Sequence, residues 1–321
     1  MNNSTTVNQT RASSAKSGSP ALQLRRLALL LLVATALGGC GIASKSAKPS
    51  ITRLYNGPSS AVYETLESPK DAESALKRAD YSTQLGNIDE ALYYYVKTLE
   101  FDPGNRQALN RIGDIHLERE NYDPAEAAYR LALSADPKNA NALMGLGLIQ
   151  YHHGKDTDAA QSLSAALSVD PKLWRARSVL GLLADRRGEH AAAAQEFSKA
   201  LQIQPNNPAV LNNLGYSKYL SGDLSGSLQM FDLALMADPK YPSAWLNKGL
   251  VYARLNNEQA ALGAFKRVLP EADAYNNLGY IWMMDGRTDA AYECFQRAIS
   301  LSPTYHLLAH ENLKRLDAMN Q

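Results

Sequence analysis

Residues 174–207 read WRARSVLGLLADRRGEHAAAAQEFSKALQIQPNN, and the pattern of this 34-residue stretch decides the fold. Gly188 falls where a first helix would end, and glycine readily takes the left-handed backbone conformation of such a cap. Small side chains at the eighth and twentieth positions, Gly181 and Ala193, allow two antiparallel helices to approach closely. Phe197, one turn after Ala193, fills the space beside them. The stretch therefore predicts a helix–turn–helix unit.

The same pattern recurs along most of the chain. Asp-Pro or a close variant ends each second helix, because proline cannot continue the helical hydrogen-bond ladder. These prolines lie 34 residues apart, at Pro103, Pro137, Pro171, Pro205 and Pro239. Aligned on them, the chain divides into seven units: 72–105, 106–139, 140–173, 174–207, 208–241, 242–271 and 272–305.

Two units depart from this pattern at the turn between their helices. The sixth has Asn256 in place of glycine, the next best residue for a left-handed cap. The second has Glu120, for which we expect a less regular turn. The sixth unit is also four residues short, so residues 268–271 should run almost directly into the next helix.

In length and in its signature positions the unit resembles the tetratricopeptide repeat. The resemblance covers residues 72–305 and implies an all-α fold, a right-handed superhelix of about seven helix-turn-helix repeats. Residues 306–321 add a C-terminal capping helix and tail, and Leu308, Leu313 and Leu316 are spaced to cover the last repeat.

A short apolar stretch, LALLLLVATALGGCGIAS, occupies residues 27–44. Its uncharged core, residues 27–37, would reach only about 16 Å as a helix. A bilayer core is about 30 Å thick, so this stretch is too short for a stable span. Four basic residues and no acidic residue precede it, which is typical of a signal peptide. We therefore expect residues 1–39 to be a signal peptide that is removed.

Residues 37–40, LGGC, resemble the lipobox of bacterial lipoprotein precursors. The resemblance implies cleavage before Cys40, a lipid on its sulfur and an acylated new N-terminus. Gly41 stands where an aspartate would favour the inner membrane, so we expect the outer membrane, facing the periplasm. Residues 40–71 would be the lipidated cysteine and a flexible tether rich in Ser, Ala, Gly, Pro and Lys. The alternative is an ordinary secretory signal in which Cys40 has no role.

Charge, cysteine content and motifs argue against several classes of protein. Without residues 1–39 the chain keeps 29 basic and 32 acidic residues, so no basic surplus indicates nucleic acid. With Cys40 lipidated, Cys294 has no partner in the chain and is expected to be a small buried hydrophobe. No phosphate-binding loop, nucleophile elbow or paired CxxC occurs. His306 and His310 could share a helix face, but no third ligand is evident nearby in the sequence, so we predict no metal site. Since catalytic and cofactor-binding motifs are absent too, we predict no cofactor and no enzyme.

The concave face of the repeats offers a binding surface instead. In tetratricopeptide repeats the concave positions are mainly two, five, six, nine and twelve. Position six is asparagine in the last three repeats, and a primary amide can both donate to and accept from a peptide backbone. We therefore predict a groove for an extended peptide, formed by Asn212, Asn213, Asn247, Asn276, Asn277, Tyr216, Tyr219, Tyr280 and Met283. The alternative is that the asparagines only bond a neighbouring helix and the tyrosines only pack.

Residues 208–317 resemble the repeat lipoproteins of Tad (Flp-type) pilus assembly systems. The shortened junction at residues 269–273 and the terminal SPTYH and ENL carry this resemblance. It implies a non-enzymatic, lipid-anchored scaffold of the outer membrane whose partner is a secretin or another pilus assembly component. Two alternatives stay open: a pilotin-like lipoprotein of type IV pili, and an adaptor for periplasmic proteases or peptidoglycan enzymes.

Overall fold

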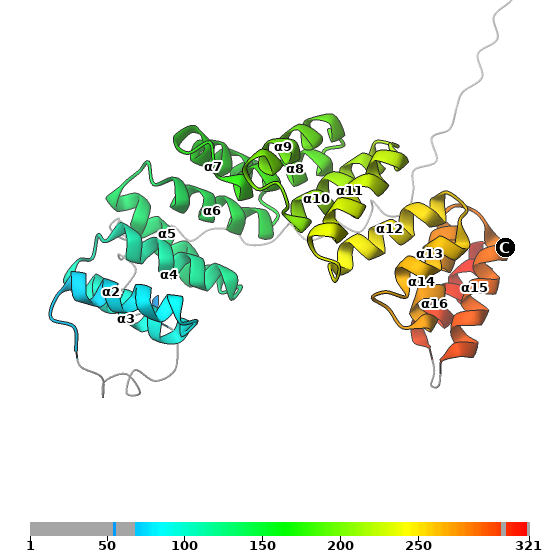
Figure 1. Cartoon of the computed structure of the whole chain (residues 1–321), viewed down its shortest axis with the longest axis horizontal. Helices are drawn as coiled ribbons and strands as arrows, with labels where there is room; N and C mark the ends of the chain where they lie inside the picture. Colours follow the sequence, from blue (N-terminus) through cyan, green and yellow to red (C-terminus); the bar gives the residue numbers. More distant parts are fainter. Residues whose placement is uncertain (1–53, 56–67, 303–305, 320–321) are drawn as a thin grey trace, which may run out of the picture. The chain divides into compact units, whose positions relative to one another are not determined.

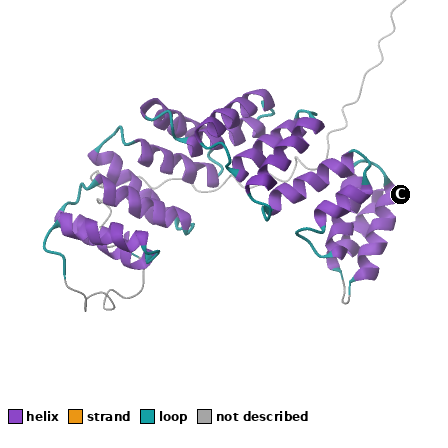
Figure 2. Cartoon of the chain, in the orientation of Figure 1, coloured by secondary structure: helices purple, strands orange, loops and turns teal. Residues whose placement is uncertain are grey.

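The computed structural model describes residues 54–55, 68–302 and 306–319. In this part of the chain the secondary structure is helical, without strands (Figures 1 and 2). The helices are α2 (Ala72–Gln84), α3 (Ile88–Phe101), α4 (Arg106–Glu118), α5 (Tyr122–Ala135), α6 (Ala140–His152), α7 (Asp156–Val169), α8 (Trp174–Arg186), α9 (His190–Ile203), α10 (Pro208–Leu220), α11 (Leu224–Ala237), α12 (Pro242–Arg254), α13 (Glu258–Phe265), α14 (Glu271–Met284), α15 (Thr288–Leu301) and α16 (Leu307–Met319). The expected signal peptide, Cys40 and most of the tether lie outside the described residues.

Consecutive helices pack as pairs, α2 with α3, α4 with α5, and so on to α14 with α15. From α4 onward, each first helix also contacts the first helix of the next pair, as α8 contacts α10 and α10 contacts α12. Such stacking of helix pairs, each touching only its neighbours, is typical of a tetratricopeptide solenoid. The prediction of an all-α fold built from helix pairs is confirmed.

Glycine at position eight of the repeat allows the two helices of a pair to approach closely. A Cβ atom built on Gly249 would lie 2.4 Å from Cε1 of Phe265, and one on Gly181 would lie 2.7 Å from Cε1 of Phe197. Both aromatic rings are buried. Each ring fills the space that the missing side chain leaves, as the sequence pattern predicts.

The turn inside each pair contains a residue with positive φ. Glycine occupies five of these turns, while Glu120 and Asn256 adopt φ of 58° in the other two. The expectation of a less regular turn at Glu120 is wrong. The N–H of Asn121 donates to the carbonyl of His116 at 2.8 Å, and the turn at Gly154 has the matching bond at 2.9 Å. These backbone bonds hold Glu120 in a conformation that side chains ordinarily disfavour.

The shortened sixth repeat has the shortest second helix among the described residues. Helix α13 has eight residues and ends at Phe265, and α14 begins at Glu271, directly after Pro270. Within the described residues, no helix has both the length and the apolar character that crossing a membrane requires.

Helix α16 packs against α14 and α15 at the C-terminal end. Its buried residues, Ala309, Asn312 and Leu316, form a single stripe along the helix. Leu313 is partly buried beside them. The expectation that Leu308 covers the last repeat is wrong, because this side chain lies off the stripe and is 57% exposed.

Candidate peptide-binding groove

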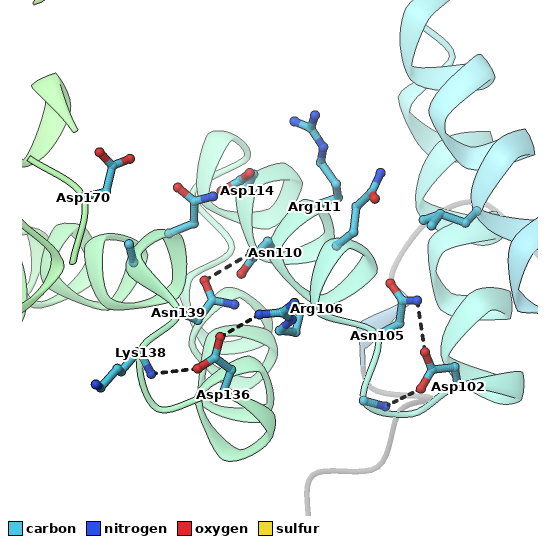
Figure 3. A pocket seen from close by; sticks show the side chains of 15 residues that line it. Asp102, Asn105, Arg106, Asn110, Arg111, Asp114, Asp136, Lys138, Asn139 and Asp170 are labelled. Carbon is cyan, nitrogen blue, oxygen red and sulfur yellow. Dashed lines mark hydrogen bonds and ion pairs between the residues drawn. The ribbon is translucent and has the colours of Figure 1, made fainter. Parts of the chain in front are cut away.

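Two hollows lie along the first helices of the repeats. The N-terminal one encloses about 800 Å³ and is lined mostly by polar and charged side chains (Figure 3). These side chains bind one another: Arg106 pairs with Asp136 at 2.8 Å, and Asn105 donates to Asp102 at 3.1 Å. Asn105 also caps α4 by accepting the N–H of Ala108 at 3.0 Å. Such bonds hold the turns between repeats.

A partly buried acid and a buried tyrosine link α4 to α5 at the edge of that hollow. The hydroxyl of Tyr129 donates to Asp114 at 2.8 Å. Burial raises the pKa of Asp114, and the bond from Tyr129 partly opposes the rise. Burial, together with the charge of Asp114, also raises the pKa of Tyr129, so the hydroxyl remains a donor at neutral pH.

The second hollow, here named the first-helix groove, encloses about 600 Å³ across α6, α8, α10 and α12. It is lined by Tyr151, Leu182, Asp185, Arg186, Asn212, Asn213, Tyr216, Leu220, Ser243, Leu246 and Asn247. All of them lie on first helices, because stacking places the same face of each repeat side by side. The groove therefore extends over four repeats.

Asparagine amides connect neighbouring repeats within the groove. Nδ2 of Asn247 donates to Oδ1 of Asn212 at 2.9 Å, from α12 to α10. Nδ2 of Asn212 lies 3.5 Å from Oδ1 of Asn213. Asn212 is buried, whereas Asn213 and Asn247 are partly exposed. The amide N–H groups of Asn213 and the Oδ1 atom of Asn247 keep hydrogen-bonding capacity toward the groove.

An apolar surface lies beside these amides. It is formed by Tyr151, Leu182, Tyr216, Leu220 and Leu246. Tyr216 and Leu220 are each 39% exposed. The ring of Tyr216 lies 5.8 Å from that of Tyr219, whose hydroxyl accepts from Nε of Arg254 at 3.0 Å. A partly exposed aromatic ring supported by its neighbours is a suitable anchor for a partner's apolar side chain.

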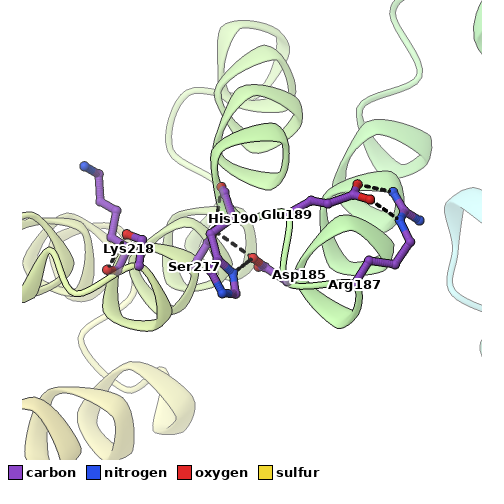
Figure 4. A network of polar contacts seen from close by, with 7 residues as sticks. Asp185, Arg187, Glu189, His190, Ser217 and Lys218 are labelled. Carbon is purple, nitrogen blue, oxygen red and sulfur yellow. Dashed lines mark hydrogen bonds and ion pairs between the residues drawn. The ribbon is translucent and has the colours of Figure 1, made fainter. Parts of the chain in front are cut away.

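Asp185 is the acidic residue of the groove, and two donors hold it (Figure 4). Oγ of Ser217 and Nδ1 of His190 each lie 2.9 Å from Oδ1 of Asp185. Since these three residues belong to α8, α9 and α10, the carboxylate joins one repeat to the next.

Arg186 is the basic residue of the groove. It pairs with Asp156 at 2.7 Å, and its guanidinium carbon lies 4.2 Å from the ring centroid of Tyr151. Because both charged residues are held by partners inside the protein, the groove presents chiefly amide and apolar groups to a ligand.

The structure places four of the nine predicted residues in the groove: Asn212, Asn213, Tyr216 and Asn247. Asn276 is buried and accepts from Nδ2 of Asn312 at 3.0 Å, so it bonds a neighbouring helix. Met283 is wrong as a groove residue, because its side chain is fully buried in the core of the last repeats. Tyr219, Asn277 and Tyr280 lie on first helices but outside the groove lining.

Sequence reasoning missed four apolar groove residues, Tyr151, Leu182, Leu220 and Leu246. Tyr151, Leu182 and Leu246 occupy positions twelve, nine and five of their repeats. Five, nine and twelve are among the concave positions on which the prediction was based, so these positions would have found all three. Attention to the C-terminal asparagines placed the predicted groove too far along the chain.

The histidines and the cysteine singled out in the sequence occupy defined places in the described part of the chain. There, no group of three or more His, Cys, Asp or Glu side chains is arranged to hold a metal ion. Nδ1 of His306 accepts the N–H of Ala309 at 3.3 Å, at the start of α16. Cys294 is buried on α15, as predicted, and burial raises the pKa of its thiol to about 12. The thiol is therefore protonated at neutral pH.

Family models match most of the chain. Residues 32–241 match the model described as the cilia and flagella-associated protein 70 C-terminal domain. Residues 212–273 and 272–305 match two models of the tetratricopeptide repeat. No curated protein matches the sequence.

Solved structures share the fold at low sequence identity. A tetratricopeptide repeat protein from Parabacteroides merdae ATCC 43184 is 19% identical, with a TM-score of 0.53 over 77% of this chain and 99% of that one. Pseudomonas aeruginosa pilF is 21% identical, with a TM-score of 0.53 over 70% of this chain and 96% of that one. PilW, a widely conserved type IV pilus biogenesis factor, is 22% identical, with a TM-score of 0.53 over 63% of this chain and 96% of that one.

Proposed function

Because this chain belongs to the tetratricopeptide repeat proteins, in the family of the cilia and flagella-associated protein 70 C-terminal domain, we propose that it is a scaffold that holds a protein partner in the first-helix groove. One observation carries the proposal. The groove combines the partly exposed amides of Asn213 and Asn247 with the exposed ring of Tyr216, across four successive repeats. Proteins with tetratricopeptide repeats generally act as interaction scaffolds rather than as enzymes.

The ligand that suits this groove is an extended peptide segment. Packed helices lie roughly 10 Å apart, and an extended chain rises about 3.3 Å per residue, so successive first helices meet about every third residue. The amides of Asn213 and Asn247 bond the peptide backbone whatever its sequence. Tyr216 and the leucines beside it then accept apolar side chains. The groove therefore binds the backbone of a peptide of any sequence, but it favours peptides with apolar side chains.

The cellular setting that we propose is the periplasmic side of the outer membrane. The LGGC sequence at residues 37–40 supports lipid attachment to Cys40, and Gly41 supports transfer to the outer membrane. In this setting the scaffold assists assembly of a Tad (Flp-type) pilus, and its partner is the secretin or another assembly component. The resemblance of residues 208–317 to Tad repeat lipoproteins is the support for this choice over type IV pili.

Purification after mild cross-linking in cells tests the proposal. The wild-type protein should enrich a secretin or another pilus component, identified by mass spectrometry. The double variant Asn213→Ala, Tyr216→Ala should enrich the partner at least about tenfold less than the wild type does. The reason is that a central aromatic anchor contributes about 2 kcal/mol or more to the binding free energy. The Cys40→Ser variant should no longer be recovered in the membrane fraction, because it lacks the sulfur that carries the lipid.

Tyr292→Ala is the matched control, since Tyr292 is an exposed tyrosine on a second helix, α15. It should enrich the partner as the wild type does. Equal enrichment by the double variant would contradict binding in the groove. Enrichment of proteases or peptidoglycan enzymes without any pilus protein would replace the pilus role by the adaptor role.

A further inference from the structure

The outer face of α3, in the first repeat, is apolar where the other repeats are polar. Tyr93 and Val96 occupy positions 22 and 25 of the repeat, and each is only 8% exposed. In later repeats, position 22 is Ala127, Gln161, Gln195, Gln229, Gly263 and Glu293, and position 25 is Arg130, Ser164, Ser198, Asp232, Lys266 and Gln296. All of these except the partly buried Ala127 are exposed. The face that ordinarily meets solvent is therefore covered in the first repeat.

Two residues that precede the repeats lie on this region. Leu54 is fully buried and belongs to the same apolar cluster as Tyr93 and Val96. The ring of Tyr55 meets that of Tyr93 edge to face, with centroids 6.0 Å apart. Side-chain burial and ring contact thus fix these two residues against the repeats.

A buried histidine on α4 completes the contact. Nε2 of His116 lies 2.8 Å from the carbonyl oxygen of Leu54. Because a carbonyl only accepts, the ring donates through Nε2. The Nδ1 atom of His116 is buried and has no hydrogen-bond partner. The bond to the backbone of Leu54 is therefore the polar contact that compensates the burial of this ring.

We propose that the outer face of α3 together with His116 of α4 is a docking site for Leu54 and Tyr55 of the same chain. Leu54 lies only 18 positions before Ala72, so its local concentration at the site is high and favours docking within one molecule. Leu54 and Tyr55 pack in the apolar cluster that contains Tyr93 and Val96, which accounts for apolar residues on this face.

Docking shortens the link between the repeats and whatever precedes them. An extended chain spans at most about 3.5 Å per residue. From Cys40 to Ala72 the chain could reach about 110 Å, but from Cys40 to a docked Leu54 only about 50 Å. Where Cys40 carries the lipid of the proposed function, the site would hold the first repeat within about 50 Å of the membrane.

Trypsin tests the docking within a single chain. It cuts after Lys45 and after Arg53, whereas the proline after Lys48 protects that bond. If Leu54 is docked, the Arg53–Leu54 bond of the protein purified from cells should be cut at least about tenfold more slowly than the Lys45–Ser46 bond. Burying a leucine shifts an equilibrium by a factor of about ten or more. Equal cleavage rates at the two bonds would overturn the proposal.

Variants on both sides of the contact separate docking from general unfolding. Leu54→Asp should remove the protection of the Arg53–Leu54 bond. The double variant Tyr93→Gln, Val96→Ser gives the first repeat the residue types of later repeats, and it should remove the protection while α3 stays folded by circular dichroism. Leu255→Asp, at a leucine that is already 47% exposed, should change nothing.

Dilution distinguishes docking within one molecule from docking between two copies of the chain. Protection that is unchanged on dilution is the result expected for docking within one molecule. Protection that disappears on dilution would overturn the proposal, because the segment would then come from a second copy. Release of the protein from membranes has no bearing on this test, so failure of the lipid anchor and failure of docking are separate outcomes.

Discussion

The contact between glycine and an aromatic ring is the smallest unit on which this fold depends. In the sixth repeat, Gly249 faces Phe265 so closely that an added Cβ would lie 2.4 Å from the ring. The ring is part of a rigid buried cluster and has little room to move. Gly263, in the second helix of the same repeat, has no atom within 4 Å of an added Cβ. Two glycines of one repeat therefore have different reasons to be glycine.

Substituting alanine at each glycine should give effects of opposite sign. Gly249→Ala should lower the free energy of unfolding, because overpacking costs about 1–3 kcal/mol and exceeds the roughly 1 kcal/mol gained in helix propensity. Gly263→Ala should raise it by up to about 1 kcal/mol, since only the propensity changes. Midpoints of urea denaturation measure both. Destabilisation of equal size by both changes would refute the close-contact explanation.

The ring of His116 should make stability depend on pH. Burial is the main cause that lowers the pKa of His116 from its ordinary value of 6.5, and the positive charge of Arg119 acts in the same direction. The unfolded chain therefore binds a proton at pH values where the folded chain does not. The contribution of the uncharged His116 ring to stability is fully present above pH 6.5, and it is lost as the pH falls below that value.

The variant His116→Gln keeps a side-chain N–H donor but has no titratable group. Melting temperatures of this variant and of the wild type should be compared about one unit above and one unit below pH 6.5. The wild type should lose more stability on acidification than the variant does. An identical loss in both would contradict a buried neutral His116.

At the scale of single elements, the turns show what sequence can and cannot predict. Glycine at the turn position correctly indicated where first helices end, because few other residues adopt positive φ. Glu120 was the exception, and it takes the same conformation as the glycines. Local preference of one residue could not reveal this, since the backbone bonds of the neighbouring helices impose the turn. Helix pairing overrides the preference of Glu120.

This strain should be measurable. Glu120→Gly should stabilise the protein, because a left-handed residue with a side chain costs about 1–2 kcal/mol and glycine avoids that cost. The gain should be about 0.5–1 kcal/mol, as glycine also loses more backbone entropy on folding. Gly154→Ala, the reverse change at the same position of the next repeat, should destabilise by a similar amount. Calorimetric melting would detect both, and a loss of stability in Glu120→Gly would show that the turn is unstrained.

At the scale of the whole molecule, the repeat period predicted the fold, and position within the repeat predicted part of the groove. Asn213, Tyr216 and Asn247 lie in the groove as expected from their positions. At position five, Asn276 is buried, as Asn212 is. At position twelve, Met283 is buried, whereas Tyr219 is partly exposed. Helix α16 packs on α14, and Met283 lies in the core of the last repeats, so position twelve at the end of the array differs from position twelve in its middle. A rule derived from internal repeats cannot predict such contacts of a terminal repeat.

The central claim is that a partner occupies the first-helix groove, and site-specific photo-cross-linking tests it most directly. A photoreactive amino acid would replace Tyr216 in the groove or, in a second protein, Tyr292 on α15. After irradiation of living cells, we expect a discrete adduct from position 216, containing a secretin or another pilus assembly protein, and none from position 292. No adduct from position 216, or the same adducts from both positions, would contradict the claim.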